Sequence, residues 1–159
     1  MIFWRTSDSA VSAFRNAIRS EFGEDGFTGG VIAESILGLN VKYDDEELNC
    51  TISMPGYIAA VAERFGVNQR TTLPNSPLPL NHVDRKHEGT PLPEEKRKLF
   101  QQIVGCAGWA SFNAKPEAMV ASSFLAQHCH NPGEEHLKLG HDLIGYLYLS
   151  LIHISEPTR

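Results

Sequence analysis

Four consecutive acids, Asp44 to Glu47, are the first residues of this chain that suggest chemistry. Carboxylates can hold two metal ions around an in-line displacement, but such a site needs several carboxylates that converge from different parts of a chain. Here the acids follow Tyr43 directly and stand in one row between two stretches with strand patterns. Because such a row is typical of a solvated hairpin tip, the sequence predicts no catalytic residue and no metal ligand at Asp44 or Asp45.

A second candidate is a group of histidines and one cysteine: His128, Cys129, His130, His136 and His141. Zinc sites use pairs such as Cys-x2–4-Cys and His-x3–5-His. His136 and His141 are five residues apart on a predicted helix, so they point to different sides of it. No cysteine pair accompanies them. A zinc site and exposed helix-end histidines are the two interpretations, and the sequence favours the second.

The only dense basic run is Lys96-Arg97-Lys98. Lysine and arginine side chains contact nucleic-acid phosphates without reading sequence, so these three residues are the candidate nucleic-acid-binding site. The alternative is a solvated helix face beside Glu94 and Glu95.

The elements that must position these residues follow from hydrophobic periodicity. It predicts an amphipathic helix over Ser9–Phe22, a mostly buried strand over Val31–Tyr43 and a half-buried strand over Leu48–Ser53, which together form a β-hairpin. A helix then begins near Pro55, capped by Ser53, and ends at Gly66.

Residues 71–93 hold five prolines and predict an extended connector. A long helix is expected from about Glu94 to Asn113, with Leu99, Phe100, Ile103, Val104 and Ala107 on its apolar face. Gly105 and Gly108 each lower helix propensity by roughly 1 kcal/mol, which suggests that another element approaches closely there.

Trp109 and Phe112 could stack on bases, although their helical spacing from Leu99 and Ile103 favours the core. Pro116 opens a further helix, with Met119, Val120, Phe124 and Leu125 expected to point inward. The last helix is expected over Glu134–Leu149. The predicted fold class is α+β: a β-hairpin flanked by an amphipathic helix, then a mostly helical region, as part of a larger domain.

Composition limits the function classes. The formal net charge is −5, whereas a protein that binds nucleic acid strongly by itself is usually basic. Three cysteines form no disulfide framework, which favours a reducing intracellular compartment. No apolar run reaches the roughly 20 residues of a membrane span, so no membrane partner is expected.

A series of sequence landmarks lies in fixed order along the chain. They are Ile36-Leu37-Gly38-Leu39-Asn40-Val41, Ile52-Ser53, Tyr57-Ile58, Arg64-Phe65-Gly66, Ser76-Pro77-Leu78, Phe100 to Cys106, Ala114-Lys115-Pro116-Glu117, Asn131-Pro132, His136-Leu137 and Tyr146-Leu147. In this order and spacing they resemble the C-terminal part of a copia-type (LTR retrotransposon) reverse transcriptase, over about residues 1–149.

The resemblance implies a division of the chain. Residues 1–50 would be the end of the palm, 51–70 the start of the thumb, 71–93 the proline-rich connector and 94–149 thumb and connection helices. Residues 151–159 do not fit the family. They resemble a translated sequencing-adapter tail, so residues 150–159 are expected to be a non-native tail outside the fold.

The activity implied for the parent protein is RNA-directed DNA polymerisation with Mg²⁺. The metal-binding carboxylates would lie before Met1, so this part holds no cofactor and is expected to be inactive alone. Its helices would position the RNA–DNA template–primer duplex. The other implied partners are the upstream palm and downstream ribonuclease H segments of the same polyprotein, in the cytoplasm, a virus-like particle or the nucleus.

The rival interpretation is a decayed retroelement remnant or a non-catalytic helical interaction module. Lys115 stands where the family has Arg, and Glu117 where it has Asp. The basic residues that family members carry near His141 and Asp142 are missing. These departures are typical of decay.

Overall fold

The computed structural model describes residues 8–23, 35–44, 49–79 and 92–154. The chain divides into two units, residues 1–34 and 35–159. Within the first unit, helix α1 (Asp8–Phe22) confirms the predicted amphipathic helix. It ends at Gly23, whose amide donates to the Arg19 carbonyl with φ of 78°, a left-handed conformation that glycine adopts without strain.

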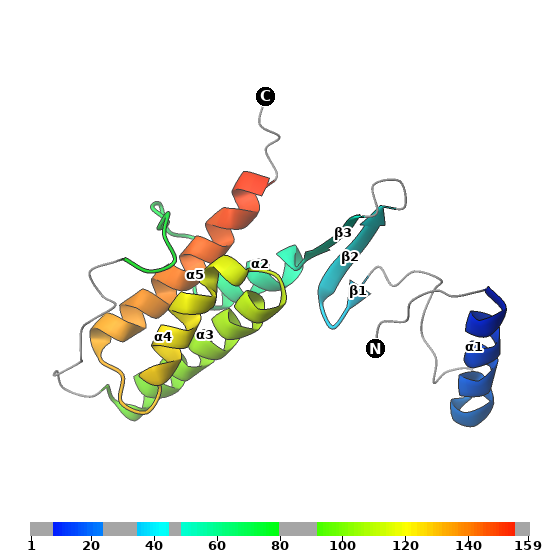
Figure 1. The fold of residues 1–159 in the computed structure, drawn as a ribbon. Coiled ribbons are helices and arrows are strands. Elements are labelled where there is room, and N and C mark those ends of the chain that lie inside the picture. Colours follow the sequence, from blue (N-terminus) through cyan, green and yellow to red (C-terminus); the bar gives the residue numbers. More distant parts are fainter. Residues whose placement is uncertain (1–7, 24–34, 45–48, 80–91, 155–159) are drawn as a thin grey trace. The chain divides into compact units, whose positions relative to one another are not determined.

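The second unit begins with a three-stranded antiparallel sheet in the order β1 (Ser35–Ile36), β2 (Leu39–Asp44), β3 (Asn49–Ser53) (Figure 1). A single strand over Val31–Tyr43 is therefore wrong. Leu37 and Gly38 both have positive φ, 53° and 82°, and connect β1 to β2 as a tight two-residue turn. Residues 31–34 of the expected strand lie outside the described part.

The predicted hairpin between β2 and β3 is confirmed, with Asn40 opposite Ser53 and Asp44 opposite Asn49. The chain then passes through Met54, which is buried, into α2 (Pro55–Arg64). Pro55 takes the first helical position as expected. The expected cap is wrong, because Met54 and not Ser53 occupies the N-cap position and no side chain caps the helix.

Four further helical segments complete the unit: α3 (Glu94–Asn113), η3 (Pro116–Ala118), α4 (Met119–Gln127) and α5 (Glu134–Ile154). In Figure 1, α3, α4 and α5 lie side by side, and α2 packs against α3 and α5. The core is formed mainly by apolar side chains of these helices, among them Ile58, Phe100, Ile103, Leu125, Leu143, Ile144 and Leu147. The α+β fold class is confirmed.

Helix α5 extends five residues beyond the expected end at Leu149. Leu151 is half-buried and packs against the core, so the fold includes the start of the segment that was expected to lie outside it. Residues 155–159 lie outside the described part.

The inward side of α4 agrees only in part with the expectation. Leu125 is buried as predicted, but Val120 is 74% exposed, and the small residues Ala121 and Ser122 are buried instead. Burial of Ser122 lets its hydroxyl meet that of Ser111 on α3 at 2.8 Å, which satisfies both groups in the core. The close packing of α3 and α4, and not hydrophobicity alone, therefore determines which residues of α4 are buried.

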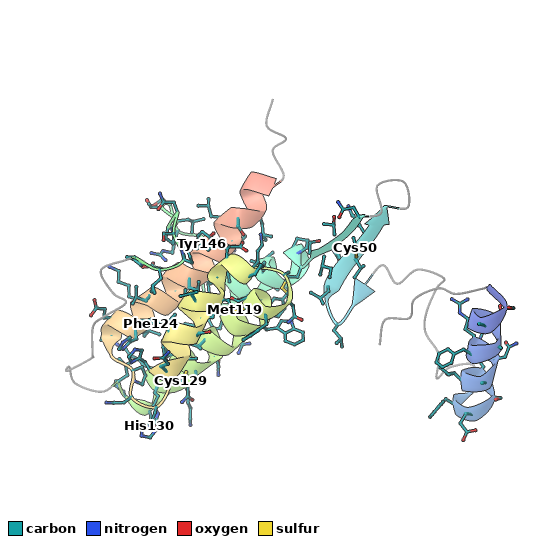
Figure 2. All side chains as sticks on the ribbon, viewed as in Figure 1. Cys50, Met119, Phe124, Cys129, His130 and Tyr146 are labelled. Carbon is teal, nitrogen blue, oxygen red and sulfur yellow. The ribbon has the colours of Figure 1, made fainter. Side chains whose placement is uncertain are left out.

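Stacked histidine rings connect the end of α4 to the start of α5. Figure 2 labels Phe124, Cys129 and His130 in this region. The His136 and His128 rings stack with centroids 4.0 Å apart, and Phe124 packs edge-on against His128. The Gly133 amide donates to His136 Nδ1 at 3.0 Å, a capping contact at the helix start. The interpretation as exposed helix-end histidines is thus wrong for His136, which is buried.

Two phenylalanines on α3 test the assignment of its faces. Phe100 is fully buried and Phe112 is 71% exposed. Phe100→Ala should lower the free energy of unfolding by about 3–5 kcal/mol, whereas Phe112→Ala should change it by no more than about 0.5 kcal/mol. Urea denaturation of both variants measures the difference. Equal effects would show that the helix is oriented differently.

Candidate nucleic-acid interface

The predicted basic site lies in the first turns of α3, where every cation has an acidic neighbour. Lys96 pairs with Glu134 of α5, and Arg97 pairs with Glu94. Lys98 Nζ lies 3.5 Å from the other oxygen of Glu94. The structure thus brings the three predicted residues together with two carboxylates that offset most of their charge.

These ion pairs are exposed, and exposed pairs contribute only about 0–1 kcal/mol. A phosphate could therefore compete for the cations at small cost. Lys98 is the most available, since its side chain is 67% exposed and its partner is the most distant of the three. A nucleic-acid-binding role of Lys96, Arg97 and Lys98 stays a prediction.

A stripe of exposed residues runs along the same helix, and we call it the α3 face: Lys98, Gln101, Gly105, Trp109 and Phe112. Their spacing of three or four residues places them on one side. The interpretation of the two aromatic residues as core is wrong, because Trp109 is 41% exposed and Phe112 more so. The core uses Phe100 and Ile103 instead.

Gly105 lies at the middle of the α3 face, one turn from Gln101 and one turn from Trp109. Among the described residues, nothing outside its own helix backbone lies within 4 Å of where a Cβ would stand, and the same holds at Gly108. The expected close approach of another element is therefore not found within the described part. The backbone at Gly105 is left open to a partner from outside.

Helix α2 is fixed against α3 by polar contacts at both ends. The Tyr57 hydroxyl donates to the Cys106 carbonyl at 3.3 Å. Burial of the hydroxyl, followed by its interaction with the Cys106 side chain, raises the pKa of Tyr57 well above its ordinary value. At the other end, Arg64 donates to the Gln102 side chain at 3.0 Å and lies over the Phe65 ring. These contacts place the guanidinium beside the α3 face.

An open hollow of about 260 Å³ lies between the segment after α2 and one side of α5. Residues 65–67 and Arg70 line one wall, and Lys138, His141 and Asp142 line the other. Arg70 Nη1 lies 2.8 Å from Asp142 Oδ1. Sequence reasoning missed this hollow because Arg70 and Lys138 are far apart in the chain, and only the packing of the loop on α5 brings them together.

Only the first residue of the acidic run lies in the described part of the chain. Asp44 is the last residue of β2, as expected for a hairpin tip, and residues 45–48 lie outside the described part. Within the described ranges, no group of three or more His, Cys, Asp or Glu side chains is placed to hold a metal.

Comparison with protein-family models, with curated proteins and with solved structures finds no match to this chain. Among the described residues, none of the helices combines the length and apolar character that a membrane span requires.

The ion pairs of Lys96, Arg97 and Lys98 determine how much these residues should contribute to the salt dependence of duplex binding. Three free cations on B-DNA would give a log–log salt slope of about −2.7. Because Glu94 and Glu134 already neutralise them in part, replacing Lys96, Arg97 and Lys98 together with Ala should change the slope by clearly less. Fluorescence anisotropy with a labelled duplex at several salt concentrations measures it. Loss of the full slope would show that the ion pairs open completely on binding.

Proposed function

We propose that this chain is the C-terminal part of a copia-type reverse transcriptase and that it positions a template–primer duplex without performing chemistry. The order of the sequence landmarks supports the family. One of them, Arg64-Phe65-Gly66, holds the last residue of α2 and the two residues that follow it, and another, Phe100 to Cys106, lies in the middle of α3. These are the parts of the molecule that border the α3 face.

The open backbone at Gly105 is the observation that carries the proposal. An RNA–DNA hybrid resembles A-form RNA, whose minor groove is wide and shallow and displays hydroxyls and base edges. A helix can approach such a groove closely where a residue has no side chain. On one side of Gly105, the Gln101 side-chain nitrogen donates to the Cys129 carbonyl at 2.9 Å, and its oxygen can accept a hydrogen bond from a hydroxyl of the groove. On the other side, the Trp109 ring can pack on sugars.

Charge on the neighbouring surface fits contact with a phosphate backbone. Lys98 and Arg64 border the α3 face, and Arg64 makes its side-chain contacts with a neutral amide and an aromatic ring. The net charge of −5 opposes strong binding. Binding by this chain alone is therefore weak, salt-sensitive and without sequence preference, since phosphate contacts carry no sequence information. In the parent polyprotein, the palm and ribonuclease H segments would hold the same duplex, within an intracellular compartment.

A second candidate is a non-catalytic interaction module left from a decayed element. Trp109, Phe112 and Val120 are large apolar side chains exposed on α3 and α4, and exposed apolar surface often marks a protein interface. This candidate predicts that the α3 face binds protein and that a duplex does not compete.

Substitution of Gly105 by a residue with a side chain distinguishes duplex positioning from the interaction module. Gly105→Leu should weaken binding of an RNA–DNA hybrid by about tenfold or more, or 1.4 kcal/mol, because Leu blocks the approach of the groove. The same change should stabilise the helix by roughly 0.5–1 kcal/mol. Anisotropy with a labelled hybrid and urea denaturation measure the two effects.

Gly56→Leu is the matched control. Gly56 lies in the first turn of α2, is exposed and also has open space around it. This variant should bind the hybrid like the wild type. Equal binding by wild type and Gly105→Leu would remove the main support for duplex positioning and favour the interaction module.

The chain alone should incorporate no dNTP on a primed RNA template with Mg²⁺. The reason is that the convergent carboxylates that two-metal chemistry needs are not provided by one acidic row. A primer-extension assay tests this. Extension that disappears in Asp44→Asn would show that Asp44 at the end of β2 is catalytic.

A further inference from the structure

We propose that the hollow between residues 65–70 and α5 binds a phosphate group of the nucleic-acid backbone. Its lining combines two cations from distant parts of the chain, Arg70 and Lys138, with one carboxylate, Asp142. The source of the phosphate rests on the proposed function, whereas the binding of phosphate itself does not.

The backbone of the loop cannot supply the anion contacts. The Gly66 amide donates to the Glu63 carbonyl, and the Val67 amide donates to the Ala62 carbonyl. Both donors are used to end α2. A ligand in the hollow must therefore be held by side chains, and the charge of those side chains decides what it is.

The side-chain charge in the hollow is positive. Asp142 offsets one of the two cations, and its contact uses one nitrogen of Arg70, while a guanidinium has five N–H donors. Lys138 is exposed, and no carboxylate of the described residues lies within ion-pair distance of it. An arginine held in place by a carboxylate beside an uncompensated lysine suits a phosphate oxygen.

His141 completes the wall with a fixed ring. Its Nδ1 lies 2.9 Å from the Leu137 carbonyl. Since a carbonyl only accepts, Nδ1 carries the proton. This bond to its own helix holds the ring at the edge of the hollow, and its other nitrogen is not engaged by that bond.

A series of side-chain contacts links the hollow to α3. Phe65 forms part of the hollow and is covered on one side by Arg64, and Arg64 in turn bonds Gln102 of α3. A nucleic-acid backbone that leaves the α3 face across α2 would reach Arg70 and Lys138. The hollow thus provides a second contact point on a different pair of elements.

The test titrates the whole 159-residue chain with inorganic phosphate at constant ionic strength, and separately with an RNA–DNA hybrid. Lys138→Gln should weaken binding of phosphate roughly fivefold, the effect of one unit charge at about 4 Å in water. Asp142→Asn should strengthen it by a similar factor, because it removes the opposing charge. Backbone NMR shifts at Gly66 and Val67 locate the phosphate, and calorimetry gives the affinity.

Lys42→Gln is the matched control, since Lys42 is an exposed lysine on β2 and its loss changes the net charge equally. It should leave phosphate binding unchanged, and thermal melts confirm that each variant is folded. Weaker binding of both phosphate and hybrid in Lys138→Gln alone supports the proposal. Equal weakening in Lys42→Gln, or no shift at Gly66 and Val67, overturns it.

The two proposals fail in different ways. If Lys138→Gln weakens binding of inorganic phosphate but not of the hybrid, the hollow takes a free phosphate and its assignment to a nucleic-acid backbone is overturned. If Lys138→Gln has no effect and Gly105→Leu still prevents hybrid binding, the hollow proposal fails and duplex positioning stands.

Discussion

The close contact of α3 with α5 is the constraint on which the rest of the helical unit depends. It is made at Gly140, where a Cβ would stand 3.0 Å from Ile103 and 3.7 Å from the Phe100 ring. A larger residue at this position would require the Ile103 side chain to shift. Because Phe100 and Ile103 are committed to this contact, the opposite side of α3 must face outward, and the exposure of Gly105 and Trp109 follows from it.

A second glycine of α5 fixes the other candidate surface. A Cβ at Gly145 would stand 3.0 Å from Pro74 and 3.4 Å from Leu73 and Val67. The loop after α2 therefore lies directly on α5, and this brings Arg70 to Asp142. The two glycines lie five residues apart, so they serve different neighbours. One helix thus sets the position of both the α3 face and the hollow.

The sequence predicted the bounds of helices and strands better than it predicted which side of a helix is buried. The bounds of α3 and the β2–β3 hairpin were predictable because helix-period and strand-period patterns are strong there. The outward side of α3 was not, because it carries Trp109 and Phe112, which are as apolar as the core residues. Hydrophobicity cannot decide between two apolar sides of one helix. Close approach decides it here, through Gly140, whose role depends on contact with Ile103 and Phe100 on a helix distant in the sequence.

The sequence alone also does not show how much of a basic residue's charge is available to a ligand. A run such as Lys96-Arg97-Lys98 is visible in the sequence, but its carboxylate partner Glu134 lies on another helix. Arg70 and Lys138 show no pattern in the sequence, yet the fold places them around one hollow with a single opposing acid. The charge available to a ligand is the sum over neighbours in space. The inconspicuous pair is therefore less compensated for each cation than the conspicuous run, because one carboxylate faces two cations in the hollow, whereas two carboxylates face three cations at the start of α3.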